Sequence, residues 1–359
     1  KRDVIRVVTP GTVMESNLLE EKKNNYLMCI YKSGIFYGVT VCDISTGDFR
    51  TTQIKDNNNF ALLMDEISRY SPAELIVNPM MYECNEEIEK IRTRFDVYIT
   101  KLEEEEFAEN EDTTAIAYNL VNDNDDKVDS FDGMELCRFS TNAMIRYLQD
   151  TQKTNLDHIN KLVIYNVTKY MSLDINARRN LEITEKLRDK SKKGTLLWVL
   201  DKTATAMGGR MLRRWLSDPL VDDVQINKRL NAVEELKNNI ILRGDITEAL
   251  KKVYDIERLA GKIAYGSVNG RELISLKNSA SQLPEIKGIL SNTNSKLLKE
   301  LFESLDDLQD IYKLIDDTII DEPPISTKEG GLIKLGYNEE IDKLKTATTD
   351  GKKWLIELE

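Results

Sequence analysis

The hydrophobic pattern of the chain changes its period near the middle, and this change constrains the fold more than any other feature. Over the first hundred residues, apolar residues alternate with polar ones or form short runs rich in β-branched and aromatic side chains, which is typical of β-strands. From residue 176 onward they recur every three or four positions, which is typical of amphipathic helices. The sequence therefore predicts an α/β domain followed by an all-α helical bundle.

The first part of the chain predicts three consecutive strands joined by tight turns, an antiparallel meander, because Gly, Ser and Thr separate the strand-like runs. These strands are expected at 26–31, 36–44 and 49–54. A helix at 60–70, a strand at 73–77, a helix at 86–93 and a strand at 96–100 are expected to follow. The resulting order, βββαβαβ, is that of an RNase H-like domain.

The second part predicts helices separated by brief breaks. One apolar stripe is expected to end before Pro284, and residues 296–320 are expected to form one long helix. Another helix is expected to begin at Tyr337. Stripes at this spacing are more typical of a packed bundle than of a cofactor site.

Rare residues exclude several classes of protein. His158 is the only histidine, so one chain cannot build a zinc site from several imidazoles, and a Ser-His-Asp or Cys-His site would depend on this residue. Its polar neighbourhood favours a surface or capping role. The four cysteines, at 29, 42, 84 and 137, form no C-x-x-C pair, and we expect reduced thiols, with Cys29 and Cys42 buried as small hydrophobes.

The sequence also lacks the signals of nucleotide loops and membrane spans. It contains neither G-x-x-x-x-G-K-[ST] nor G-x-G-x-x-G, the two common phosphate-binding loops. No run approaches the roughly 18 apolar residues that suggest a membrane-spanning helix. The sequence starts at Lys1 without a Met and without a charged-then-apolar leader, so we expect it to be a piece of a longer, cytoplasmic protein.

The negative charge is concentrated in one window. The formal net charge is −12, and residues 102–135 hold 13 acids against the single base Lys127. Like charges at this density favour a solvated, poorly packed segment. Carboxylates at 123–126 suit Mg²⁺ or Ca²⁺, but the Gly and terminal Glu of an EF-hand are missing, so a solvated loop is the preferred interpretation.

Asp43 invites a nuclease hypothesis. RNase H-like nucleases hold two metal ions with clustered carboxylates, and Asp43 lies at the end of the second expected strand. The neighbouring strands offer Asp96 alone as a partner carboxylate. The simpler interpretation is that Asp43 and Asp48 hydrogen-bond the backbone of the Ser-Thr-Gly turn between them.

A basic stretch lies in the second part. Residues 178–214 hold eleven bases and four acids, which allows a phosphate-contacting surface that binds DNA with a steep salt dependence. The bases are not interleaved with aromatic residues, and Trp215 fits an apolar stripe. We therefore favour solvated faces of two helices, with arginines paired to neighbouring acids, and leave DNA contact by Arg178 to Arg214 open.

Several segments resemble the MutS family of DNA mismatch-recognition proteins. They are 174–183 (DINARRNLEI), 194–203 (GTLLWVLDKT), 205–216 (TAMGGRMLRRWL), 219–220 (PL), 255–259 (DIERL), 336–342 (GYNEEID), 7–12 (VVTPGT) and 43–47 (DISTG). In the first of these, Asn176 and Ala177 replace the family's usual small or hydroxyl residues. The resemblance covers essentially the whole chain in the family's order.

The resemblance implies a division into parts. Residues 1–12 would be the linker from a mismatch-binding domain, 13–165 an RNase H-like connector domain without nuclease activity, 166–338 the lever or core helical domain, and 339–359 the start of a clamp helix. The mismatch-contacting Phe-x-Glu motif and the ATP-binding loop would lie outside the chain. The piece itself would then be no enzyme, although the intact protein is expected to be an ATPase that uses ATP and Mg²⁺.

The resemblance also implies a role in bacterial mismatch repair and the DNA damage response. The piece would relay conformational change between the ATPase, clamp and mismatch-binding parts, and its connector would offer a docking surface for MutL. The intact protein would bind mismatched duplex DNA as a homodimer, without a membrane. No residue of this chain is assigned a catalytic, cofactor-binding, metal-binding or DNA-binding role. The alternative is a metal-dependent nuclease of RNase H-like fold.

Overall fold

The structure is a computed structural model that describes residues 6–347 except 58–59, 123–130, 132, 154–155 and 157. The chain packs as two compact units: the first holds the residues up to 227 together with 260–266, and the second holds 228–259 and the residues from 267 onward. The division falls inside two helices, α10 (Asp223–Asn238) and α12 (Ile256–Ala264). No described helix is long and apolar enough to cross a membrane.

The first unit is built on a six-stranded mixed sheet with the order β5-β4-β1-β2-β3-β6. The strands are β1 (Leu27–Ser33), β2 (Phe36–Asp43), β3 (Asp48–Lys55), β4 (Glu74–Val77), β5 (Tyr98–Lys101) and β6 (Leu162–Ile164). β1, β2 and β3 form the predicted antiparallel meander, with Leu27 opposite Cys42 and Asp43 opposite Asp48. β4 runs parallel to β1, β5 parallel to β4, and β6 parallel to β3.

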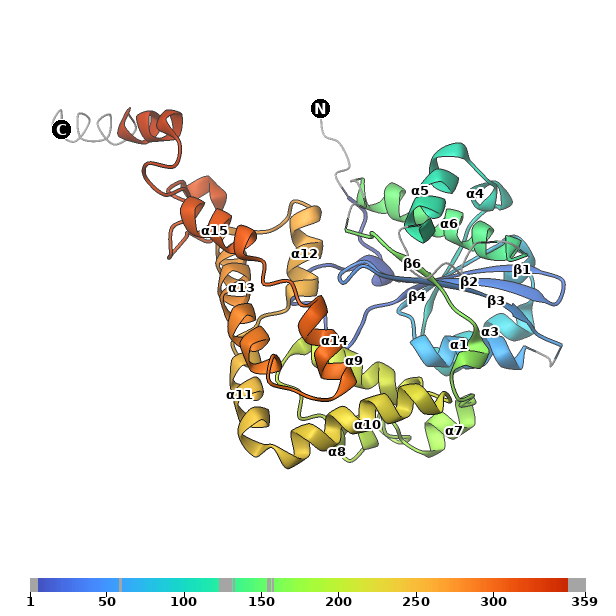
Figure 1. Cartoon of the computed structure of the whole chain (residues 1–359). Helices are drawn as coiled ribbons and strands as arrows, with labels where there is room; N and C mark the ends of the chain where they lie inside the picture. The colour runs from blue at the N-terminus through green and yellow to red at the C-terminus, as the bar shows by residue number, and fades with distance from the viewer. Residues whose placement is uncertain are drawn as a thin grey trace. The chain divides into compact units, whose positions relative to one another are not determined.

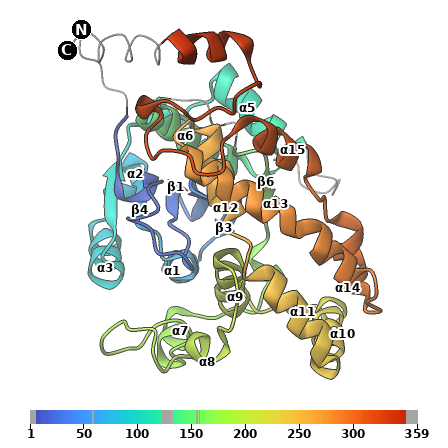
Figure 2. The ribbon, with the colours of Figure 1, turned by 90° about the vertical axis from the view of Figure 1, so that its left-hand side faces the viewer.

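Helices cover both faces of this sheet (Figures 1 and 2). They are α1 (Ala61–Tyr70), α2 (Pro79–Tyr82), α3 (Asn85–Phe95), α4 (Glu104–Phe107), α5 (Glu111–Asn122) and α6 (Glu135–Gln152). Because side chains alternate along a strand, Met28 and Ile30 pack in the core shared with α1 and α3, whereas Leu27 and Cys29 pack in the core shared with α5 and α6. The apolar alternation that predicted the strands therefore fills two cores.

Shorter segments complete the first unit. They are η1 (Pro10–Thr12), η2 (Val167–Lys169), α7 (Ile175–Asn180), α8 (Leu196–Leu200) and α9 (Ala206–Ser217). Both ribbon views place α7 and α8 on the side of α1 that faces away from the sheet (Figures 1 and 2). Three of their caps follow from the sequence, because Asp174, Thr195 and Thr205 each accept a hydrogen bond from a backbone N–H in the first turn, as N-cap residues do.

The second unit is described as helices, turns and one isolated β-bridge. It contains most of α10 and the first part of α12, with α11 (Ile240–Leu250), α13 (Gly270–Leu290), α14 (Lys296–Ser304), α15 (Gln309–Thr318) and η3 (Thr327–Glu329). α13 packs against α11, α14 and α15. Two apolar clusters hold these helices together, one centred on Leu283 and Leu290 and the other on Leu276 and Ile315.

Two expectations about the second unit are wrong. The expected helix over 296–320 is divided into α14 and α15, because Leu308 adopts a left-handed conformation with φ 48° and its N–H donates to the carboxylate of Asp306. The stripe that was expected to stop before Pro284 instead continues in α13 to Leu290. Proline removes one N–H from a helix, but burial of Leu283, Ile286 and Leu290 on either side of it stabilises the continuation.

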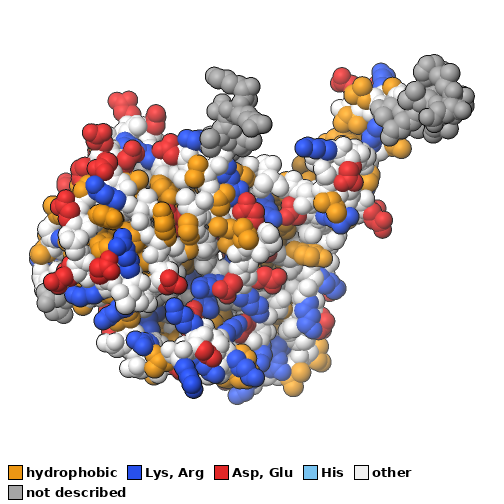
Figure 3. All heavy atoms as spheres, turned by 180° about the vertical axis from the view of Figure 1, so that it is seen from behind, with side chains coloured by type: hydrophobic (Ala, Val, Ile, Leu, Met, Phe, Trp, Pro, Cys, Tyr) orange, Lys and Arg blue, Asp and Glu red, His pale blue; other side chains and the backbone are white. Residues whose placement is uncertain are grey.

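The acid-rich window also differs from the expectation of a solvated, poorly packed segment. α4 and α5 lie within it, and Phe107, Ala117, Leu120 and Val121 are buried. Their acids occupy the outer surface, which shows as a red area at the upper left of Figure 3. The carboxylates at 123–126, considered as a metal site, lie outside the described residues.

Candidate functional site

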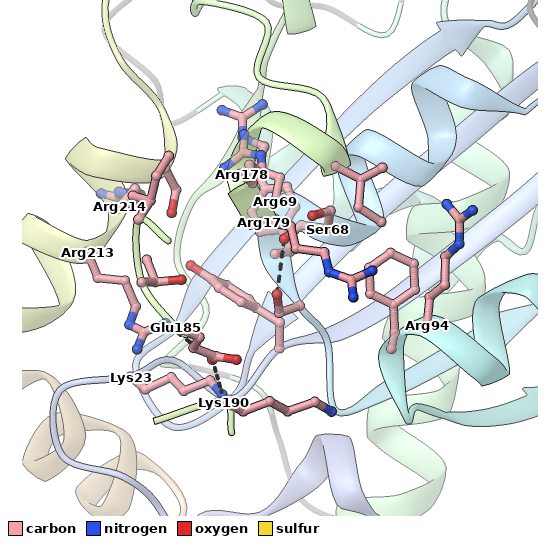
Figure 4. A pocket seen from close by; sticks show the side chains of 18 of the residues that line it. Lys23, Ser68, Arg69, Arg94, Arg178, Arg179, Glu185, Lys190, Arg213 and Arg214 are labelled. Carbon is pink, nitrogen blue, oxygen red and sulfur yellow. Dashed lines mark hydrogen bonds and ion pairs between the residues drawn. The ribbon is translucent and has the colours of Figure 1, made fainter. Parts of the chain in front are cut away.

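A cavity of about 580 Å³ in the first unit has a lining whose charged side chains are mainly cationic. We call it the cationic cavity. Its described lining contains two acids, Glu185 and Asp218, and ten bases: Lys23, Arg69, Arg94, Arg178, Arg179, Lys186, Lys190, Arg210, Arg213 and Arg214. Figure 3, which shows the molecule from behind, shows Lys and Arg side chains gathering in the lower part of the view. Figure 4 shows several of the bases that line the cavity at close range.

Distant segments of the chain supply these bases. Arg69 lies in the last turn of α1 and Arg94 in the last turn of α3, whereas α7 carries Arg178 and Arg179. Helix α9 carries three more, Arg210, Arg213 and Arg214. Residues three and four apart lie on one face of a helix, so the sequence RMLRR of α9 presents all three arginines on the same side.

Ion pairs fix part of this cluster and connect α1 to the end of α9. Arg69 Nε donates to Asp218 Oδ1 at 2.6 Å, and their side chains are 5% and 6% exposed. The Arg69 guanidinium also pairs with Glu66 and lies over the rings of three tyrosines, Tyr70, Tyr165 and Tyr170. A buried charge is costly without such partners, so this contact holds the two helices in a defined arrangement.

A second connection joins the sheet to α9. Asp48, at the start of β3, accepts hydrogen bonds from Arg50, Arg214 and the hydroxyl of Tyr26. Burial favours the neutral form of this carboxyl, but the charges of Arg50 and Arg214 outweigh burial and hold the pKa of Asp48 below its ordinary value. The carboxylate therefore stabilises the contact between β3 and α9.

A third connection is centred on Asp201, between α8 and α9. Lys22 Nζ donates to Asp201 at 3.1 Å and to the Thr203 carbonyl at 3.1 Å, and Lys192 Nζ donates to the other Asp201 oxygen at 2.5 Å. Although burial opposes it, hydrogen bonds from Lys192 and Thr203 lower the pKa of Asp201 well below its ordinary value. We call these three connections, made by Asp218, Asp48 and Asp201, the ionic junction.

Five bases of the cationic cavity have no carboxylate partner within 4.0 Å in the described part of the chain; they are Arg94, Arg178, Arg179, Lys186 and Lys190. The Nε–H of Arg178 donates a hydrogen bond to the Leu173 carbonyl oxygen. Arg213 approaches Glu185 at 3.9 Å, and the same carboxylate lies 3.8 Å from Lys23 (Figure 4). Burial lowers the pKa of Arg178 and that of Arg213.

The basic stretch is therefore only partly as expected. Lys192, Arg213 and Arg214 do pair with acids. The expectation that the bases occupy solvated helix faces is wrong for Arg178 and Arg210, which are half-buried and buried. The local charge count marked residues 178–214 but missed Lys23, Arg69 and Arg94, because the approach of distant segments leaves no local signal.

The other residues considered from sequence have structural surroundings. Asp43 Oδ1 accepts from the Ser45 N–H and hydroxyl, and Oδ2 accepts from the Asn24 side chain and the Asn25 N–H, so the turn interpretation is confirmed for Asp43. It is wrong for Asp48, because the side chains of Tyr26, Arg50 and Arg214 take up that carboxylate instead. Asp96 is an exposed residue that ends α3. Among the described residues, no three His, Cys, Asp or Glu side chains are grouped as metal ligands. The geometry therefore offers no support to the nuclease alternative.

His158 and the cysteines also have structural roles. His158 Nε2 lies 2.9 Å from the Ile44 carbonyl oxygen and so braces the turn that follows β2. Cys29 and Cys42 are buried free thiols, as expected, and Cys137 is buried too. Cys84 is free and partly exposed. The described geometry therefore gives no sign of a nucleophile activated by histidine.

Comparison with known proteins places both parts of the chain in one class, the DNA mismatch repair proteins. Residues 25–160 match the family model MutS domain II, and residues 176–352 match MutS domain III. The chain belongs to the MutS family. Along its whole length it is 48% identical to the DNA mismatch repair protein MutS of Ruminiclostridium cellulolyticum and to that of Acetivibrio thermocellus, and 46% identical to that of Clostridium tetani.

The chain spans about two fifths of the length of these bacterial relatives, 41%, 41% and 39% respectively. Strands β1 to β5 of the first unit lie within the domain II match, and β6 lies just beyond its end. The cationic cavity draws residues from both matched regions.

Proposed function

We propose that the chain is the non-catalytic connector and first lever segment of a MutS-type mismatch repair protein. Its role is to relay conformational change between the ATPase, clamp and mismatch-binding parts of the intact protein. The observation that carries the proposal is the match to two consecutive MutS domains in the family's order. The ionic junction supports it, because the buried pair between α1 and the end of α9 and the ion pair between β3 and α9 let these elements move as one body.

In this proposal residues 13–165 form an RNase H-like connector and 166–338 the lever. Residues 1–12 are a linker, and 339–359 begin the clamp. The meander of β1, β2 and β3, followed by β4 and β5 with helices between them, supports the first assignment. The run of consecutive helices from α10 to α15 supports the assignment of 166–338 to the lever.

The partners belong to the intact protein. We propose that the connector docks MutL, that the protein acts in the cytoplasm as a homodimer on mismatched duplex DNA, and that ATP and Mg²⁺ are used outside this chain. The chain then needs no cofactor or catalytic residue of its own. The names of its relatives support mismatch repair as the process.

A binding experiment on the chain tests the proposal. Matched and mismatched duplexes are titrated with the chain at 50 and 200 mM salt with Mg²⁺, and the DNA is then checked for cleavage. Weak, salt-sensitive binding without mismatch preference or cleavage is expected, because backbone contacts alone do not read sequence. Cleavage, or tight binding selective for the mismatch, would contradict a non-catalytic connector and lever.

A further inference from the structure

The cationic cavity is short of negative charge. Its described lining has ten bases and two acids. Asp218 is already paired with Arg69, and Glu185 is shared between Lys23 and Arg213. The pKa of Arg178 is lowered by burial, with a contribution from Arg69, and the pKa of Arg213 is lowered by burial. Of the bases without a carboxylate partner, Arg178 and Lys186 are therefore held partly out of water without a matching anion, whereas Arg94, Arg179 and Lys190 lie at the exposed rim.

The cavity is also preformed by the fold. The ionic junction fixes α9 against α1 and β3, while Asp65 accepts the Ile175 N–H at 2.9 Å and so attaches the start of α7 to α1. The cations that lack carboxylate partners line the cavity from α3, α7 and the segment 186–190, and Figure 4 labels four of them, Arg94, Arg178, Arg179 and Lys190. A site whose walls are already ordered loses little entropy when it binds a ligand.

We propose that the cationic cavity binds a small anion that carries two or more phosphate groups. Three of the five cations without carboxylate partners are arginines, Arg94, Arg178 and Arg179, and the planar guanidinium matches phosphate oxygens with paired hydrogen bonds. The volume of about 580 Å³ falls in the usual range of small-molecule sites, roughly 300–1,000 Å³. The inference is independent of the proposed role in repair.

Calorimetric titration of the chain with inorganic tripolyphosphate, without Mg²⁺, tests this inference. The test variants are Arg179→Gln and Arg94→Gln, whose side chains line the cavity and are exposed, so both variants are expected to fold. The matched control is Arg188→Gln, an exposed arginine in the same basic stretch that lies outside the lining. All titrations use one ionic strength, because surface charges are screened by salt.

We expect one tripolyphosphate per chain, at least tenfold weaker binding in each test variant, and less than twofold change in Arg188→Gln. Loss of binding in all three variants alike would show general charge attraction and overturn the proposal. Absence of binding at millimolar tripolyphosphate would overturn it too. Displacement of tripolyphosphate by a short DNA duplex, with Arg94 and Arg179 required for duplex binding, would identify the ligand as DNA backbone and reject the small anion.

Discussion

Buried polar side chains in the first unit depend on partners from distant parts of the chain. Glu74, at the start of β4, is fully buried and accepts hydrogen bonds from the Gly11 N–H and from the hydroxyls of Thr100 and Tyr147. It thereby joins the N-terminal segment, β5 and α6. A buried donor that loses its acceptor lowers the free energy of unfolding by about 1–3 kcal/mol. Because its partners come from three elements, replacing this one side chain should weaken the contacts of all three.

Glu74→Ala is expected to lower the free energy of unfolding by about 3 kcal/mol, because it leaves one buried donor, the Gly11 N–H, and two partly buried hydroxyl donors without this acceptor. Glu74→Gln retains one acceptor oxygen and should recover part of the loss. The control is Glu89→Ala, whose exposed pair with Arg92 is worth at most about 1 kcal/mol. Urea unfolding followed by circular dichroism measures all three, and a loss below 1 kcal/mol for Glu74→Ala would contradict the described burial.

Asp48 gives stability a pH dependence. Its pKa is below the ordinary value in the folded protein, so its charge stabilises the fold above the unfolded pKa of about 3.9 and loses this effect as the pH falls through the folded pKa. Asp48→Asn is therefore expected to cost about 2 kcal/mol between pH 5 and 8. The difference should shrink below about pH 4.

Denaturant curves recorded from pH 7 down to pH 2.5 measure this difference for Asp48→Asn. Asp150→Asn is the control, since Asp150 is 73% exposed and pairs with Lys153 three residues away. Its curve should run parallel to that of the unaltered chain. A cost of Asp48→Asn that stays constant or grows on acidification would show that the carboxylate is not stabilised by Arg50 and Arg214.

At the scale of elements, α6 lies directly against β2 at Gly38. A Cβ atom at position 38 would fall 2.0 Å from the carbonyl oxygen of Leu136, well inside contact distance. Glycine inside a strand often marks such a close approach of backbone. The helix can therefore pack on the sheet only while residue 38 has no side chain.

Gly38→Ala is expected to destabilise the first unit by about 3 kcal/mol, because α6 must move away from β2. Gly244→Ala in α11 is the contrasting change, since its Cβ would meet nothing within 4 Å and alanine favours helix by about 1 kcal/mol over glycine. Thermal unfolding separates the two. Unchanged stability in Gly38→Ala would refute the packing of α6 on β2.

The same elements show what the sequence predicted and why the rest was missed. The three strands of the meander were predicted because their apolar residues alternate or form β-branched and aromatic runs, with turn residues between them. α6 was not predicted, because the residues that it buries against β2 include Ser140, whose hydroxyl lies 2.7 Å from that of Thr40, and Thr141 and Asn142. These polar residues interrupt the apolar period. β6 has only three residues and gives too short a pattern.

At the scale of the whole chain, family resemblance predicted the class, whereas the cationic cavity required the structure. The motif around Arg178 and the motif around Arg214 are each a continuous run of sequence, so their likeness to the MutS family can be detected without knowledge of the structure. Arg69 and Asp218 are 149 residues apart, and no local pattern shows that they meet. The ionic junction is consequently a finding of the structure alone.

The central claim is that this chain relays motion, and an exchange experiment tests it most directly. In a chimaera, the chain replaces the corresponding segment of MutS from Ruminiclostridium cellulolyticum, to which it is 48% identical. The rate at which the chimaera leaves mismatched DNA after ATP is added is then measured. Asp218→Asn, which weakens the ionic junction at Arg69, is compared with the exposed control Asp150→Asn. We expect the first variant to keep mismatch binding within threefold but to release DNA at least tenfold more slowly, with the control unchanged. Release by Asp218→Asn at the rate of the unaltered chimaera would contradict the relay.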